Sequence, residues 1–107
     1  MTNERFEQVF EETVGKCRAI LISKNKEYAR GGDKLSNFKK AAALQGITAE
    51  SALKGMMVKH LVSVCDYITD LEVESLHTLE AWDEKVLDSL NYLFLLRGLL
   101  EERHGQH

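Results

Sequence analysis

The chain has 107 residues, of which 44% are hydrophobic and 29% charged, and its formal net charge is −3 at pH 7. This balance is typical of one soluble globular domain, which is expected to span residues 1–107. The negative charge offers no basic surface to duplex nucleic acid, and no apolar run is long enough for a membrane helix. With no signal-peptide core at the start, a cytoplasmic location is expected.

The first predicted element is an amphipathic helix over residues 3–27, where apolar residues recur at three- and four-residue steps. Glu11 and Glu12 lie among the glutamates of its first half and are expected to be solvated rather than to bind metal. Cys17 in this helix and Cys65 further along both occupy apolar positions, so both are expected to be buried, reduced thiols.

Residues 24–38 interrupt the helical pattern around the pair Gly31-Gly32, which permits positive backbone φ angles. The segment is either a plain connection between helices or a binding segment, because cations and aromatic rings crowd around the glycines. In a binding segment the lysine would neutralise phosphate, the rings would stack on a base and the amides would read its edge. The candidate binding residues here are Lys24, Asn25, Tyr28, Asp33, Asn37 and Phe38.

Capping signals divide the remaining sequence into helices. Asp33 or Ser36 is expected to cap a short helix that runs to about Gln45 and stops at Gly46. Thr48 is a good N-cap for a long third helix that ends near Leu71 or Val73. A loop over residues 74–80, a last helix over residues 81–102 and a frayed tail over residues 103–107 complete the prediction.

The third and fourth predicted helices carry apolar residues on more than one face. A helix of this kind lies at the centre of a bundle or meets a second subunit. We therefore expect an all-α fold, a bundle of three long helices and one short helix, and a homodimer or larger assembly.

Polar residues share one face of each of these two helices. On the third helix they follow at helical steps, and on the fourth they precede a solid apolar block, so both faces are expected to reach a semi-buried site. A buried acid is costly unless it is paired or bound to metal. The residues concerned are Lys59, His60, Ser63, Asp66 and Asp70 on the third helix, and Glu84, Asp88, Asn91 and Tyr92 on the fourth.

Two interpretations of these polar faces are open. In one, they form an internal network in which Lys59 pairs with Asp88 and Lys85 pairs with Asp66. In the other, Asp66, Glu84 and Asp88 bind Mg²⁺, because carboxylates at helical spacing with one acid from a facing helix suit a hard cation. Magnesium suggests a phosphate-bearing ligand, and with Lys59 as a phosphate partner the site suits a nucleotide.

Three segments carry a resemblance to a known family: KNKEYARGGDKLSNFKKAAALQGIT, VKHLVSVCDYI and WDEKVLDSLNYLFLL. They resemble the phage and prophage family called nucleotide modification associated domain 1, which is similar to the all-α, MazG-like nucleoside triphosphate pyrophosphohydrolases. The resemblance covers about Lys24 to Leu96 and implies a MazG-like bundle, a nucleotide ligand and a bacterial or phage-infected cell. The matching positions are Lys24, Asn25, Tyr28, Asp33, Asn37, Phe38, Lys59, His60, Ser63, Asp66, Glu84, Lys85, Asp88, Asn91 and Tyr92.

The chain departs from the four-acid pattern of the MazG-like enzymes, because Lys59, Ser63 and Asp66 stand where acids would be wanted. This departure weakens the case for hydrolysis more than the case for nucleotide binding. The first hypothesis is a Mg²⁺-dependent pyrophosphohydrolase with Asp66, Glu84 and Asp88 as catalytic acids. The alternatives are a binder that sequesters a nucleotide or nucleotide-derived signal without turnover, and a helical protein-interaction domain.

Overall fold

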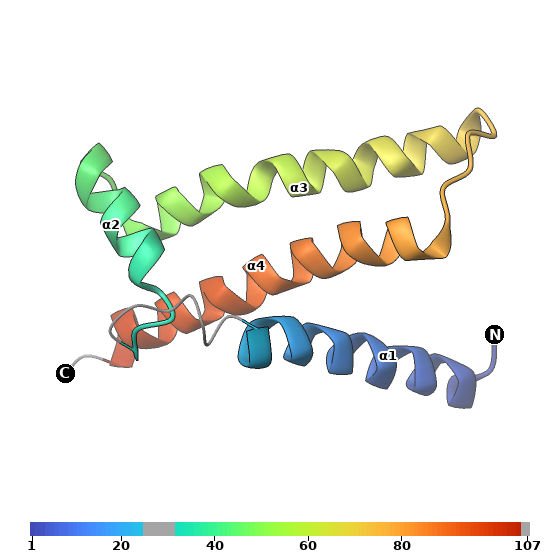
Figure 1. Cartoon of the computed structure of the whole chain (residues 1–107), viewed down its shortest axis with the longest axis horizontal. Helices are drawn as coiled ribbons and strands as arrows, with labels where there is room; N and C mark the ends of the chain where they lie inside the picture. The colour runs from blue at the N-terminus through green and yellow to red at the C-terminus, as the bar shows by residue number, and fades with distance from the viewer. Residues whose placement is uncertain (25–31, 106–107) are drawn as a thin grey trace. The chain divides into compact units, whose positions relative to one another are not determined.

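The chain is helical throughout the part described by the computed structural model, which comprises residues 1–24 and 32–105, with the backbone alone for Ser23 and Lys24. No strand occurs within those ranges, as the sequence predicts. Two compact units are present, Met1–Lys34 and Leu35–His107, and each is described by itself. The elements are α1 (Asn3–Arg18), the π-helix η1 (Ala19–Lys24), α2 (Ser36–Gln45), α3 (Ala49–Glu72) and α4 (Leu79–Gly105) (Figure 1).

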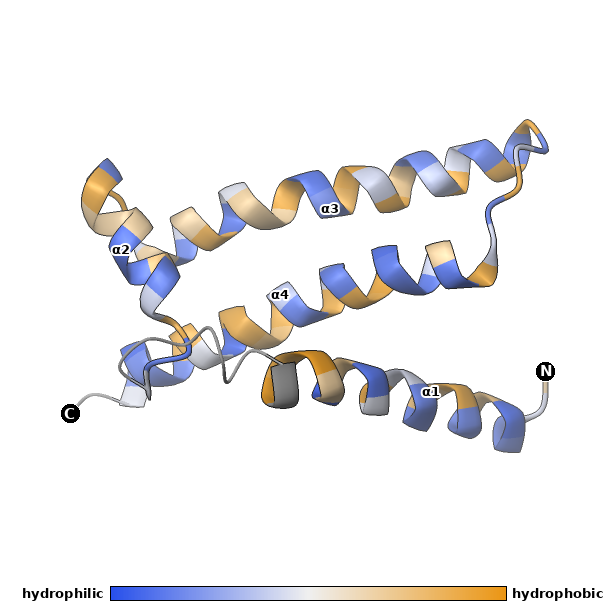
Figure 2. Cartoon of the chain, in the orientation of Figure 1, coloured by the Kyte–Doolittle hydropathy of each residue, from blue (hydrophilic) through white to orange (hydrophobic). Residues whose placement is uncertain are grey.

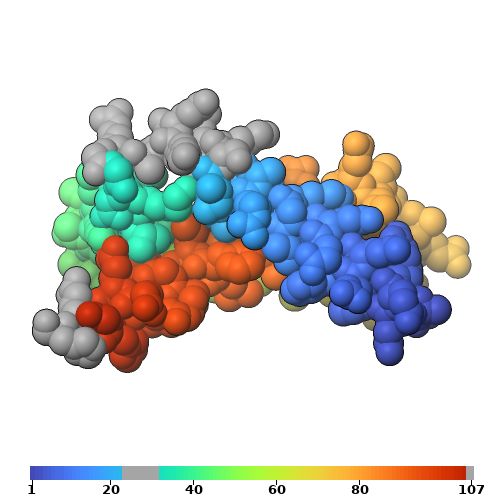
Figure 3. All heavy atoms as spheres, turned by 90° about the horizontal axis from the view of Figure 1, so that it is seen from below, coloured from blue at the N-terminus to red at the C-terminus, as the bar shows by residue number. Residues whose placement is uncertain are grey.

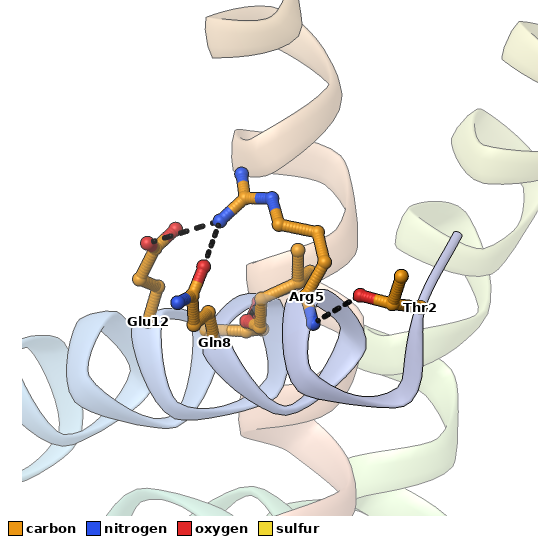
Figure 4. Close-up of polar contacts among 6 residues, drawn as sticks. Thr2, Arg5, Gln8 and Glu12 are labelled. Carbon is orange, nitrogen blue, oxygen red and sulfur yellow. Dashed lines mark hydrogen bonds and ion pairs between the residues drawn. The ribbon is translucent and has the colours of Figure 1, made fainter.

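The first unit begins with the capped, highly charged helix α1. Thr2 is the N-cap, and its hydroxyl accepts a hydrogen bond of 3.0 Å from the Arg5 backbone N–H (Figure 4). The Arg5 guanidinium lies 3.0 Å from Gln8 Oε1 and 3.7 Å from Glu12 Oε1. Because Glu11 and Glu12 are exposed, these glutamates form a solvated face, and Figure 3 shows the α1 surface in blue.

The predicted helix over residues 3–27 changes type before its expected end. The α-helix stops at Arg18, and Ala19–Lys24 continue as a π-helix with wider turns. Within this unit the Lys34 ammonium donates a hydrogen bond to the Leu21 carbonyl oxygen. Over six residues, hydrophobic periodicity does not distinguish an α-helix from a π-helix. The sequence pattern therefore could not predict this change of helix type.

The core of the second unit gathers residues of α2, α3 and α4. Leu35, Phe38, Leu53 and Leu99 form its buried cluster, and Leu53 is fully buried. Figure 1 shows α3 and α4 running antiparallel, joined by the turn after Glu72, with α2 crossing near the start of α3. Burial of four large apolar side chains in one cluster, at roughly 1.5–3 kcal/mol each, is what holds the three helices together.

The helix ends of the second unit follow the predicted caps in two of three cases. Gly46 ends α2 with φ of 68°, and the Thr48 hydroxyl caps α3 by accepting from the Ser51 N–H at 3.1 Å. The prediction that Asp33 or Ser36 caps α2 is wrong, because the N-cap position is Leu35 and no side chain caps it. Leu35 takes that position because its side chain enters the core.

The last helix is longer than the sequence predicts. α4 begins at Leu79, after Thr78 accepts a hydrogen bond of 3.1 Å from the Ala81 N–H, and it extends to Gly105. The predicted frayed tail is therefore helical up to that residue. Arg103 Nε donates a hydrogen bond to Glu50 Oε2 on α3 at 2.8 Å. This contact anchors the last turn of α4, which the sequence shows only as charged and polar.

The faces of α3 and α4 confirm that their apolar residues cover more than one side. Figure 2 shows hydrophobic residues recurring along α3, and several of them are exposed although others pack in the core. Cys17 is buried, but Cys65 is exposed, so the expectation of two buried thiols is wrong for Cys65. Within the described residues, no helix has the length and hydrophobicity needed to cross a membrane.

Candidate functional site

Among the residues singled out by the sequence, His60 on α3 and Asp88 on α4 form a polar contact between the two helices. His60 Nδ1 lies 3.5 Å from Asp88 Oδ2, and both side chains are partly exposed. This separation is at the outer edge of hydrogen-bond range.

Tyr92 lies one helical turn after Asp88, and its ring contacts the rings of His60 and Phe38. Its ring is tilted by 31° against His60 at a centroid distance of 5.1 Å and meets Phe38 edge-on at 6.4 Å. Burial, and then the negative charge of Asp88, raise the pKa of the Tyr92 hydroxyl. The hydroxyl therefore stays protonated at neutral pH and can donate a hydrogen bond.

Asn91 carries a buried side-chain oxygen, Oδ1, that has no hydrogen-bond partner among the described residues. It is only 7% exposed, and no described residue donates a hydrogen bond to its Oδ1. A buried acceptor without a donor costs about 1–3 kcal/mol. Ser89 on the same helix is equally buried, but its hydroxyl donates to the Lys85 carbonyl at 3.2 Å.

Asn91 also stands beside the His60–Asp88 contact on the helix. Asp88, Asn91 and Tyr92 follow at steps of three and one, so the three residues occupy neighbouring positions on one face of α4. The structure thus brings together three residues that the sequence singled out, His60, Asp88 and Tyr92, and Asn91 lies within one helical turn of Asp88 on α4. The arrangement offers acceptor oxygens next to flat rings.

The three acids predicted to bind Mg²⁺ are not gathered in the same way. Asp66 and Glu84 are exposed, and the described part of the chain contains no cluster of three or more acidic, His or Cys side chains that could hold a metal ion. Asp88 meets His60 instead. The prediction that Asp66, Glu84 and Asp88 bind Mg²⁺ therefore has no support among the described residues of one chain.

The alternative salt-bridge network also differs from the observed contacts. The partner of Asp88 is His60 rather than Lys59, which is exposed, and the Lys85 ammonium lies 5.6 Å from the ring centroid of Tyr67. Ser63 is half-buried on α3, on the side of the helix that carries His60.

The candidates from the segment before α2 have mixed positions. Phe38 is a core residue, Asn37 is exposed and Asp33 is half-buried in the first unit. Asn25 and Tyr28 lie outside the described residues, as does the side chain of Lys24. Phe38 therefore reaches the candidate site only through its edge contact with Tyr92.

A second cluster, at the turn between α3 and α4, was missed by the sequence prediction. The His77 ring stacks on Tyr67 at 3.7 Å with an interplanar angle of 4°, and its Nε2 lies 2.7 Å from Asp70 Oδ2. Trp82 meets Tyr67 edge-on at 5.3 Å. The sequence signals this cluster only through the spacing of Tyr67 and Asp70, which lie near each other on α3. The position of His77 depends on the conformation of the turn, which the spacing does not predict.

Comparisons of this chain with models of protein families, with curated proteins and with solved structures found no match. The resemblance to nucleotide modification associated domain 1 therefore stays a prediction.

Proposed function

We propose that this chain binds a nucleotide at the face of α3 and α4 that carries His60, Asp88, Asn91 and Tyr92. The observation that carries the proposal is the buried Asn91 Oδ1, which lacks a donor among the described residues. Unpaired buried acceptors are rare in folded proteins because they lose their hydrogen bonds to water. A ligand that supplies the missing N–H or O–H accounts for this one.

The neighbouring side chains favour the nucleoside part of such a ligand. Asn91 Oδ1 and the Asp88 carboxylate can each accept a hydrogen bond from a ligand, which suits the amino group of a base or the hydroxyls of a sugar. The rings of Tyr92 and His60 offer apolar faces next to these acceptors. Lys59, exposed and adjacent to His60 in sequence, supplies positive charge for phosphate.

The proposal concerns binding rather than cleavage. The acids predicted to act in hydrolysis do not form one cluster within the described residues of a chain, so no catalytic step is assigned to them. Turnover is measured separately, by product analysis of any nucleotide that binds, with and without Mg²⁺.

The test replaces Asn91 by leucine, which has a similar volume and no polar atom. Removing the unpaired amide should raise the free energy of unfolding of the ligand-free protein by about 1 kcal/mol. The same change should abolish the stabilisation that nucleotides give the wild-type protein in a thermal-shift and calorimetric panel. Gain of stability with loss of binding is the signature of a polar group kept for a ligand.

Ser89→Ala is the matched control, because Ser89 lies equally buried on the same helix but is already hydrogen-bonded to Lys85. This variant should keep nucleotide binding. If Asn91→Leu binds nucleotides as the wild type does, or if no nucleotide of the panel stabilises the wild type, the proposal is wrong.

A further inference from the structure

Helix α3 carries a second row of apolar side chains, which are exposed in the described part of the chain. Its members recur at steps of three, one, three and three residues, and the four aliphatic ones are 38–53% exposed. We call this row the outer stripe of α3; it comprises Val58, Leu61, Val62, Cys65 and Ile68.

The outer stripe lies opposite the face that builds the core. At 100° per residue, Leu53, His60 and Tyr67 point about 120–160° away from Cys65 around the helix axis. Leu53 is fully buried, and His60 and Tyr67 contact α4 residues, so the stripe points away from α4. It is therefore separate from the nucleotide site proposed above.

Opposite charges stand at the two ends of the outer stripe. Lys54 precedes Val58 by one turn and Glu72 follows Ile68 by one turn, and both are exposed. Both positions lie on the same side of the helix as Cys65. The stripe thus has a positive end and a negative end at equal distances from its midpoint at Ser63.

This symmetry makes the stripe complementary to itself in one orientation. When a second α3 runs antiparallel about Ser63, Val58 faces Ile68 of the other copy and Leu61 faces Cys65 of the other copy. Lys54 then faces Glu72 of the other copy at both ends, because all three pairs have the same midpoint. In a parallel pair Lys54 would meet Lys54 and Glu72 would meet Glu72, which is repulsive.

We propose that the outer stripe pairs with the same stripe of a second copy, antiparallel, in a two-fold dimer. Three features support this occupant: the exposed apolar row, the steps of three, four and three residues from Val58 through Leu61 and Cys65 to Ile68, and the charge complementarity of its two ends. The proposal does not depend on the nucleotide site. Either one can fail while the other holds.

The first test is a cycle of charge reversals, read by sedimentation equilibrium. Lys54→Glu and Glu72→Lys should each weaken the dimer roughly tenfold, because each turns two attractive contacts into two repulsive ones. The double reversal should restore wild-type affinity. Within one chain the two positions are about 27 Å apart along the helix, so a direct intrachain effect is screened.

The second test reads the register by cross-linking in a Cys65→Ser background. The double variant Lys54→Cys/Glu72→Cys should form disulfide-linked dimers under mild oxidation, whereas neither single variant should. Cross-linking by the single variants would show a parallel pair and overturn the proposed register.

The third test asks whether the stripe is the interface. Leu61→Lys should reduce the mass from about twice 12.2 kDa to 12.2 kDa at micromolar concentration. Leu44→Lys on α2 is the control, because Leu44 is also exposed but lies outside the stripe, and it should leave the dimer intact. A wild-type protein of 12.2 kDa at that concentration, or equal effects of both substitutions, would overturn the proposal.

Discussion

Tyr92 shows how one residue links burial, charge and pH at the candidate site. Its pKa is raised from the ordinary value of 10.0, first by burial and then by the Asp88 charge. In the unfolded chain the hydroxyl titrates near its ordinary pKa. The folded state therefore holds the proton more tightly than the unfolded state does.

The sign of the pH dependence follows from this difference. The contribution of Tyr92 to stability is fully present below pH 10.0 and is lost as pH rises through the folded pKa, since the unfolded chain ionises first. We predict that Tyr92→Phe loses less stability than the wild type in this alkaline range. Urea unfolding across the range, with tyrosinate absorbance as a second signal, checks it, and parallel stability curves would contradict it.

Glu74 offers a second prediction at the residue scale, because its φ of 57° places a non-glycine residue in the left-handed region. That conformation costs an L-residue roughly 1–2 kcal/mol, and glycine adopts it freely. Glu74→Gly should raise the free energy of unfolding by about 0.5–1 kcal/mol in denaturant melts. Ser75→Gly next to it should lower stability instead, because Ser75 has no such strain to relieve.

At the scale of elements, the turn between α3 and α4 is held by the stack of His77 on Tyr67 and by the His77–Asp70 contact. The backbone adds a hydrogen bond of 2.9 Å from the Ser75 N–H to the Asp70 carbonyl. Because these contacts lie at the far end of the helix pair from the Leu53 cluster, they should stabilise the turn locally.

We predict that His77→Ala lowers the free energy of unfolding by about 1–2 kcal/mol, through loss of the ring stack and the carboxylate contact. Amide exchange should accelerate from Leu71 to Trp82 and stay unchanged around Leu53. His104→Ala, on the exposed last turn of α4, should change neither. Uniform acceleration across the helix pair would mean that the turn has no local role.

At the scale of the whole molecule, the two thiols report folding and assembly separately. Cys17 is 3% exposed and burial raises its pKa, while Cys65 is exposed on the outer stripe. We predict one fast thiol per chain and one at least roughly tenfold slower toward an aromatic disulfide reagent. The fast rate should fall as protein concentration rises, because dimerisation covers Cys65.

Cys65→Ser identifies the phases, since it should remove the fast one and leave the slow one. A fast rate independent of concentration up to the range in which the mass is doubled would place Cys65 outside the interface.

Much of the secondary structure was predictable because its causes are local. Gly46 and Thr48 mark helix ends through their own backbone and side-chain geometry, and the apolar steps of α3 identify its two faces. Spacing on α4 also placed Asp88, Asn91 and Tyr92 together. These features depend on residues within one or two helical turns.

The tertiary structure decided which residues meet across helices. Sequence spacing paired Asp88 with Lys59 or with two other acids, whereas the folded helices bring His60 to it. It also left Asn91 Oδ1 buried and Cys65 exposed. The physical reason is that the rotation of each helix about its axis is set by burial of distant core residues such as Leu35 and Leu99, and a change of one residue in that packing turns every polar side chain by 100°.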